Sequence, residues 1–119
     1  MSRDLSTTGD EGLRKRLDEA VVLHATVMQL RKDLDTEEIA VPTVGVEAFE
    51  LIRGQVLQVM EMRQRTSPHA LGRIINRVDL TEKQSQQALA QDGLGGLATA
   101  AVLRCLQKVL VRMSFNNAR

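Results

Sequence analysis

Apolar side chains recur every three or four residues along most of this chain, and that spacing is the pitch of an α-helix. A strand would alternate apolar and polar side chains in steps of two. The apolar residues are mainly Leu, Ala, Val and Met, whereas the aromatic residues that strands favour are limited to Phe49 and Phe115. The spacing and the residue types together predict an all-α fold.

Capping residues, Pro and Gly divide the periodic sequence into about five helices, three long and two short. Ser67-Pro68 is typical of a helix start, Thr81-x-x-Gln84 matches the capping box, and Asp92-Gly93 is typical of a helix end. We therefore expect helices over residues 12–33, 46–65, 68–79, 81–91 and 95–115.

A chain of 119 residues suits one domain. We expect a flexible N-terminal tail over residues 1–11 and a single helical domain, a compact bundle, over residues 12–119. The last helix is apolar over most of its circumference, apart from a strip formed by Arg104, Gln107, Lys108 and Arg112. Such a helix is either the central element of the fold or part of an oligomer interface.

The N-terminus is polar, and charged residues interrupt the most apolar stretch, so we expect no signal peptide and no membrane association. Cys105 is the only cysteine, which excludes an intrachain disulfide and fits a reducing compartment. The sequence therefore predicts a cytoplasmic protein.

Few side chains are suited to catalysis. His24, His69 and Cys105 are far apart in the sequence; His24 lies on an apolar stripe, His69 follows a helix start, and Cys105 lies on the apolar last helix. The acidic segment 33–38 has a calcium-loop spacing but lacks the Gly and the final Glu of that motif. We predict no catalytic residue, no metal site and no cofactor, and treat a small enzyme with an unrecognised site as an alternative.

Charge is unevenly distributed along the chain. Residues 1–50 carry a net charge of −5, and residues 51–119 carry +6. We favour the interpretation that the two parts complement each other in the folded chain. The alternative is a basic face, with the candidate residues Arg63, Arg65, Arg73 and Arg77, that would bind an acidic partner such as nucleic acid.

The residues between the two short helices predict a polar corner, formed by Arg77, Asp79, Thr81, Glu82 and Arg112. Asp79 would accept hydrogen bonds from the start of the next helix or pair with Arg77 or Arg112. We expect this corner to have a structural role.

The segments LGRIINRVDLTEKQ (residues 71–84) and VLRCLQKVLVR (residues 102–112) resemble a family of short all-helical bacterial proteins of unknown function. The matching residues are Arg77, Val78, Asp79, Leu80, Glu82, Gln107, Lys108 and Arg112, while Asn76 stands where the family has an aromatic residue. The resemblance implies an all-α fold and implies no activity.

These observations favour a non-enzymatic helical protein-interaction module that pairs with itself as a homodimer or with another protein. Met60, Met62 and Met113 would either line an adaptable binding surface or fill the core. A nucleic-acid-associated protein that uses the basic face is the main alternative.

Overall fold

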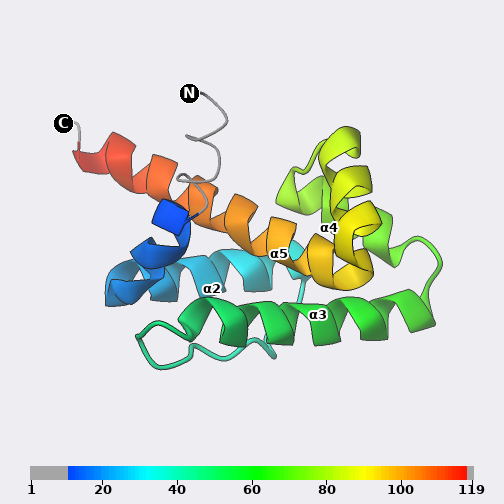
Figure 1. Ribbon diagram of the computed structural model, residues 1–119, viewed down its shortest axis with the longest axis horizontal. Coiled ribbons are helices and arrows are strands. Elements are labelled where there is room, and N and C mark those ends of the chain that lie inside the picture. Colours follow the sequence, from blue (N-terminus) through cyan, green and yellow to red (C-terminus); the bar gives the residue numbers. More distant parts are fainter. Residues whose placement is uncertain (1–10, 118–119) are drawn as a thin grey trace.

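The computed structural model describes residues 11–117 (Figure 1). Residues 11–15 are helical, and the next elements are a 3₁₀-helix η1 (Arg16–Asp18), α2 (Ala20–Leu34), α3 (Ala48–Thr66), α4 (Ala70–Val78) and α5 (Glu82–Asn117). This part of the chain contains no strand, and the predicted all-α bundle of about five helices is confirmed. The tail predicted over residues 1–11 lies outside the described residues except for Glu11, which is helical.

Helix α5 is broken after its first three turns, as Asp92-Gly93 predicts. Asp92 has φ −154° and ψ 30°, and Gly93 has φ 56° and ψ −139°, a conformation essentially restricted to glycine. We call residues 82–91 the first limb of α5 and residues 94–117 its second limb. Figure 1 shows the first limb in yellow and the second limb running from orange to red.

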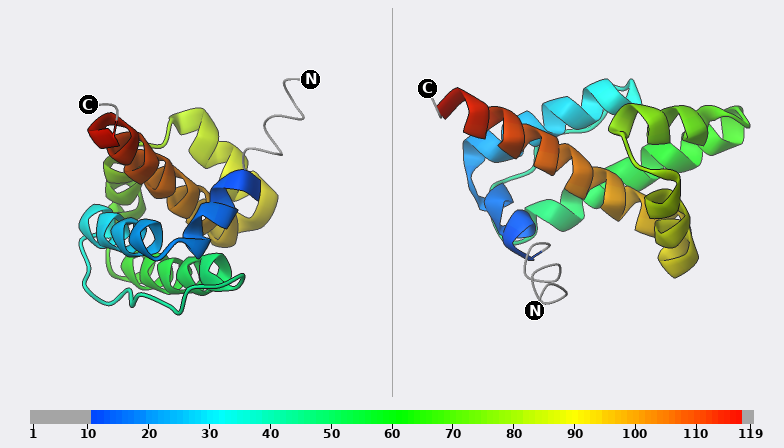
Figure 2. Two further views of the ribbon diagram at one scale, coloured as in Figure 1. Left: turned by 90° about the vertical axis from the view of Figure 1, so that its left-hand side faces the viewer. Right: turned by 90° about the horizontal axis from the view of Figure 1, so that it is seen from above.

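The second limb of α5 is the central element of the fold. It lies across α2 and α3, as the three views in Figures 1 and 2 show, and it buries one broad face against them. The buried residues of this face are Leu97, Ala98, Ala101, Val102, Cys105, Leu106 and Val109. Helix α3 contributes a stripe of buried residues to the same core: Phe49, Ile52, Val56, Val59 and Met60.

The prediction of one continuous helix over residues 12–33 is wrong. Glu19 is extended, with φ −92° and ψ 121°, and it separates η1 from α2. The break rotates α2 relative to the preceding turns, so Val22, Thr26 and Asp33 point inward. His24 is therefore exposed and does not lie on the buried stripe.

The non-helical connection between α2 and α3 is fixed at its middle. Ile39 is fully buried, and its carbonyl oxygen accepts a hydrogen bond of 2.8 Å from Arg31 Nε. The Gln55 side chain donates to the carbonyl oxygen of Ala40 and accepts from its N–H, at 3.0 and 2.7 Å. One side chain on α3 thus satisfies both backbone groups of Ala40, as a neighbouring strand would.

One helix, over Glu82–Phe115, is long and apolar enough to cross a membrane, with a mean hydropathy of 1.5 in its most apolar window. Inside the fold 39% of that window is buried. The core helix of a globular fold has the same composition, because it is surrounded by other apolar helices. The predicted absence of membrane association stays a prediction.

The two limbs of α5 approach each other at Gly96, where a Cβ atom would collide with the carbonyl oxygen of Ala88. We expect Gly96→Ala to lower the free energy of unfolding by about 2 kcal/mol, because backbone has to move to accept the methyl group. Gly54→Ala is the matched control: Gly54 lies inside α3 with open space around its Cβ position. That substitution should raise the free energy of unfolding by about 0.5–1 kcal/mol. Urea denaturation of both variants measures the difference, and equal effects would contradict the close approach.

Candidate functional site

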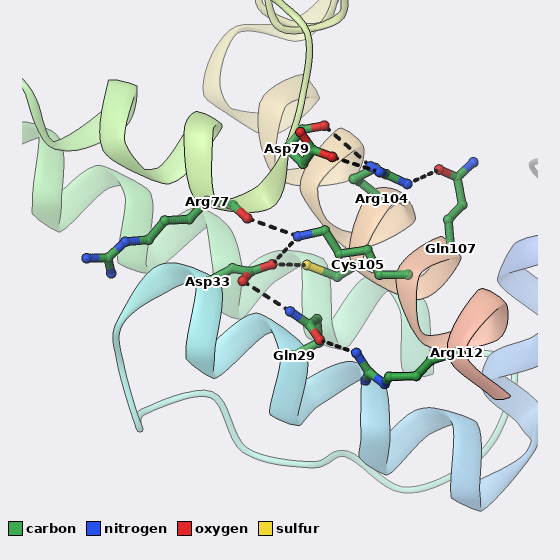
Figure 3. Close-up of polar contacts among 9 residues, drawn as sticks. Gln29, Asp33, Arg77, Asp79, Arg104, Cys105, Gln107 and Arg112 are labelled. Atoms are coloured by element: carbon green, nitrogen blue, oxygen red, sulfur yellow. Dashed lines mark hydrogen bonds and ion pairs between the residues drawn. The ribbon is translucent and has the colours of Figure 1, made fainter. Parts of the chain in front are cut away.

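A buried carboxylate, that of Asp33 on α2, connects α2 to α5 (Figure 3). Its Oδ2 atom lies 2.8 Å from Lys108 Nζ and accepts a hydrogen bond from the Cys105 thiol at 3.3 Å. Its Oδ1 atom accepts from the Gln29 amide at 3.1 Å. The Asp33 side chain is only 7% exposed and that of Lys108 20%, so the ion pair is largely withdrawn from water.

The same network extends to α4 and to the end of α5. Lys108 also donates to the carbonyl oxygen of Arg77, at the C-terminal end of α4, at 2.9 Å. Arg112 donates to Gln29 Oε1 at 3.0 Å, and Gln29 is thereby held between Arg112 and Asp33. Among the described residues, every buried side-chain nitrogen and oxygen atom has a hydrogen-bond partner. The strip of polar residues on the apolar last helix therefore serves to attach α5 to α2 and α4.

The polar corner after α4 forms with a different partner from those predicted. Asp79 pairs with Arg104, at 3.0 Å between Oδ2 and Nη2, and not with Arg77 or Arg112. Sequence reasoning placed Arg104 on the polar strip but did not connect it to Asp79, because the two residues meet only through the tertiary fold.

The predicted capping box at the start of α5 has both of its hydrogen bonds. Thr81 Oγ1 accepts from the Gln84 N–H at 3.0 Å, and Gln84 Oε1 accepts from the Thr81 N–H at 2.9 Å. Glu82, in the first turn, receives a hydrogen bond from Gln86 and forms no ion pair with another described residue.

A groove lies between α2 and the second limb of α5, and the network forms its floor. Its volume is about 410 Å³, and its lining residues are Gln29, Lys32, Arg104, Lys108, Val111, Arg112 and Phe115. Val111 and Phe115 are 56% and 73% exposed, and they lie one helical turn apart on the same side of α5. The groove thus combines exposed apolar groups with four cationic side chains.

Two of those cations already have carboxylate partners, since Lys108 binds Asp33 and Arg104 binds Asp79. Within residues 11–117, no carboxylate pairs with Lys32 or Arg112. The groove therefore has a local excess of positive charge. Sequence reasoning missed Gln29 and Lys32, which line the groove, and Asp33, which is buried and bonded to Gln29. Their spacing of three and four residues was the available signal, but their partners on α5 are distant in the sequence.

The candidate basic face is divided by the fold. Arg63, Arg73 and Arg77 line one cavity of about 130 Å³ between the C-terminal ends of α2 and α3 and the helix α4. Arg65 is exposed on α3 and does not line this cavity. The structure thus brings together three of the four predicted arginines, and nucleic-acid binding by this face stays a prediction.

The side chains considered for catalysis are not assembled. His24 and His69 are exposed, and Cys105 is fully buried. None of the three lines the groove or the basic cavity. Between residues 11 and 117, no group of three His, Cys, Asp or Glu side chains is placed to hold a metal ion.

Burial raises the pKa of the Cys105 thiol, and the neighbouring Asp33 carboxylate raises it further. The thiol therefore stays protonated at neutral pH, where a nucleophilic cysteine would need to be a thiolate. Its role in this structure is to donate a hydrogen bond to Asp33.

Comparison with protein families, with curated proteins and with solved structures found no match to this chain. The resemblance to a family of short all-helical bacterial proteins stays a prediction. The function is therefore inferred from the surfaces of this structure.

We expect Asp33→Asn to lower the free energy of unfolding by about 3 kcal/mol, because the substitution leaves Lys108 partly buried without its counter-ion. The double variant Asp33→Leu with Lys108→Met removes both charges and should recover part of that loss. Chemical denaturation of wild type, Asp33→Asn, Asp33→Leu, Lys108→Met and the double variant measures these changes and closes the double-variant cycle. A change below about 1 kcal/mol in Asp33→Asn would contradict the role given to this ion pair.

We expect Cys105 to react with a thiol reagent at neutral pH only as fast as the chain unfolds, because burial keeps the thiol covered and protonated. The raised pKa also makes the stability of the fold depend on pH. Above the ordinary thiol pKa of about 8.5, the unfolded thiol loses its proton while the folded thiol keeps it, and this favours the unfolded state. Wild type should therefore lose more stability than Cys105→Ala as pH rises from about 8 to 10. Rapid labelling of the native protein, together with identical pH profiles, would contradict this assignment.

Proposed function

We propose that this protein is a non-enzymatic helical interaction module that binds an acidic amphipathic segment of another protein in the groove between α2 and α5. The observation that carries the proposal is the exposure of Val111 and Phe115 beside Lys32 and Arg112 in one groove. Exposed apolar groups beside charged groups of one sign are typical of a surface that binds a partner of the opposite charge.

The dimensions of the groove support a helical occupant. Its lining residues on α5 extend from Arg104 to Phe115, which corresponds to about 16 Å along a helix. Three turns of an amphipathic helix have that length, and they would place apolar anchors against Val111 and Phe115. Acidic side chains on the flanks of such a helix would then meet Lys32 and Arg112.

The residues that form the floor of the groove are fixed by hydrogen bonds and ion pairs to other residues of the fold. Gln29, Lys108 and Arg112 are fixed by the network around Asp33, and Arg104 is fixed by Asp79. A surface that is already ordered loses little side-chain entropy when a partner binds. The site is therefore pre-organised for binding.

The homodimer predicted from the sequence stays a proposal, and we assign it to a surface other than the groove. A two-fold symmetric dimer through the groove would bring Lys32 and Arg112 of both copies together, and like charges across an interface are unfavourable. The cleft between the two limbs of α5, about 600 Å³ in volume and lined by Ala88, Gly96 and Ala100 among others, has no such excess of charge. A second copy is better accommodated there.

A displayed library of acidic amphipathic peptides of about four turns tests the groove. We expect selected peptides to bind wild type and to lose affinity about tenfold in Phe115→Ser and in Lys32→Glu, because each substitution removes one kind of contact. Val46→Ser is the matched control, since Val46 is 92% exposed and lies in the connection before α3. Fluorescence anisotropy at two salt concentrations measures the affinities.

Binding that is equal in all three variants would show that the groove is not the site. Sedimentation velocity of wild type and Phe115→Ser adds a second check. A dimer that dissociates in Phe115→Ser would assign the groove to a second copy of this chain and contradict the proposed partner.

A further inference from the structure

The cavity lined by Arg63, Arg73 and Arg77 is separate from the groove, and the proposed interaction does not use it. It lies where the C-terminal end of α2, the C-terminal end of α3 and the helix α4 meet. Two hydroxyl groups, of Thr66 and Ser67, also line it. A volume of about 130 Å³ is far above the space needed for a single water molecule.

The charge of this cavity is not balanced by its own residues. Asp33 and Asp35 are the carboxylates in the lining, and Asp33 already neutralises Lys108. Asp35 therefore remains as the one counter-charge for three guanidinium groups. The cavity has a local charge of about +2, counting these groups as fully ionised.

Two of the three arginines have donors to spare. Arg63 Nη2 donates to the carbonyl oxygen of Asp35 at 2.6 Å, which caps the end of α2. Arg73 has a long contact of 3.4 Å with Ser67 Oγ, and Arg77 lies 3.9 Å from Asp35 Oδ2. A guanidinium group offers five N–H donors, so most donors of Arg73 and Arg77 are free to bind a ligand.

We propose that this cavity binds a compact dianionic oxyanion, the phosphate group of a small phosphorylated molecule. A dianion balances the charge of about +2, and the planar forks of two arginines match the geometry of phosphate oxygens. The Ser67 hydroxyl supplies one further donor at the edge of the cavity, whereas the Thr66 hydroxyl already donates to the carbonyl oxygen of Arg63.

Several features favour a small ligand over a nucleic-acid backbone. An extended backbone is bound by cations distributed along a surface, and Arg65, the fourth arginine of the predicted face, lies outside the cavity. The three lining arginines instead border one cavity of about 130 Å³ formed by three helices. This arrangement fits one phosphate group rather than a chain of them.

The test is a calorimetric titration of the full chain with inorganic phosphate at constant ionic strength. Arg73→Gln and Arg77→Gln each remove one guanidinium group from the cavity, and Arg65→Gln is the matched control on the neighbouring surface. We expect saturable binding to wild type, a loss of about tenfold or more in affinity in Arg73→Gln and Arg77→Gln, and no change in Arg65→Gln. Thermal unfolding of each variant shows that the fold is retained; if one cavity variant unfolds, the other provides the measurement.

Two results would overturn the proposal. The first is the absence of saturable phosphate binding to wild type, or an equal loss in Arg65→Gln, which would indicate a general effect of surface charge. The second is tighter binding of a short oligonucleotide that Arg65→Gln weakens as much as Arg73→Gln does. That result would assign the arginines to a nucleic-acid face. Because none of these variants changes a groove residue, the outcome is independent of the peptide experiment.

Discussion

The burial of one carboxylate constrains the arrangement of the whole bundle. Asp33 lies under the last helix, and a charge in that position is tolerated only if a cation and further donors satisfy it. Lys108, Cys105 and Gln29 do so, and Lys108 in turn binds the end of α4 through the Arg77 carbonyl. Apolar packing supplies most of the stabilisation, but it is not directional. The network determines how far α5 is rotated and displaced along α2.

That choice of register also creates the surfaces of the molecule. Lys108 and Arg112 are directed toward α2, and Val111 and Phe115, on the same side of the same helical turns, stay exposed beside them. The side chains that link α2 to α5, Gln29, Lys108 and Arg112, therefore also form the floor of the groove. The basic cavity also depends on this network. The ends of α2 and α3 meet α4 beside Asp33, and because Lys108 already neutralises Asp33, this carboxylate does not balance the arginines of the cavity. The proposed binding groove and the attachment of α5 to α2 thus share the same small set of polar residues.

Local signals in the sequence were sufficient for the helices but not for their contacts. The reciprocal hydrogen bonds of Thr81 and Gln84 and the break at Asp92-Gly93 depend on neighbouring residues, and sequence reasoning predicted both. The break at Glu19 has no Pro or Gly to mark it, and His24, assigned to the apolar stripe, is exposed in the structure.

The candidate site was harder to predict for a physical reason. From the sequence alone, an aspartate such as Asp33 is expected to be exposed to water unless its ion-pair partner is known. That partner, Lys108, is distant in the sequence. The clustering of Arg63, Arg73 and Arg77 could be anticipated from their proximity along the chain. Arg65 is excluded because two residues along a helix are rotated by about 200°, so Arg63 and Arg65 lie on different sides of α3.

The distance in sequence between the members of the ion pair has a consequence for how the chain is made. Asp33 and Lys108 are separated by 75 residues, and α2 packs more extensively against the same late helix than against any other element. During synthesis the first helices emerge well before residue 108 does. Until then Asp33 has no cation to accompany it into the interior, and water solvates it better than protein can. The packing of α2 in the bundle, with Asp33 paired, is therefore completed only after α5 has been synthesised.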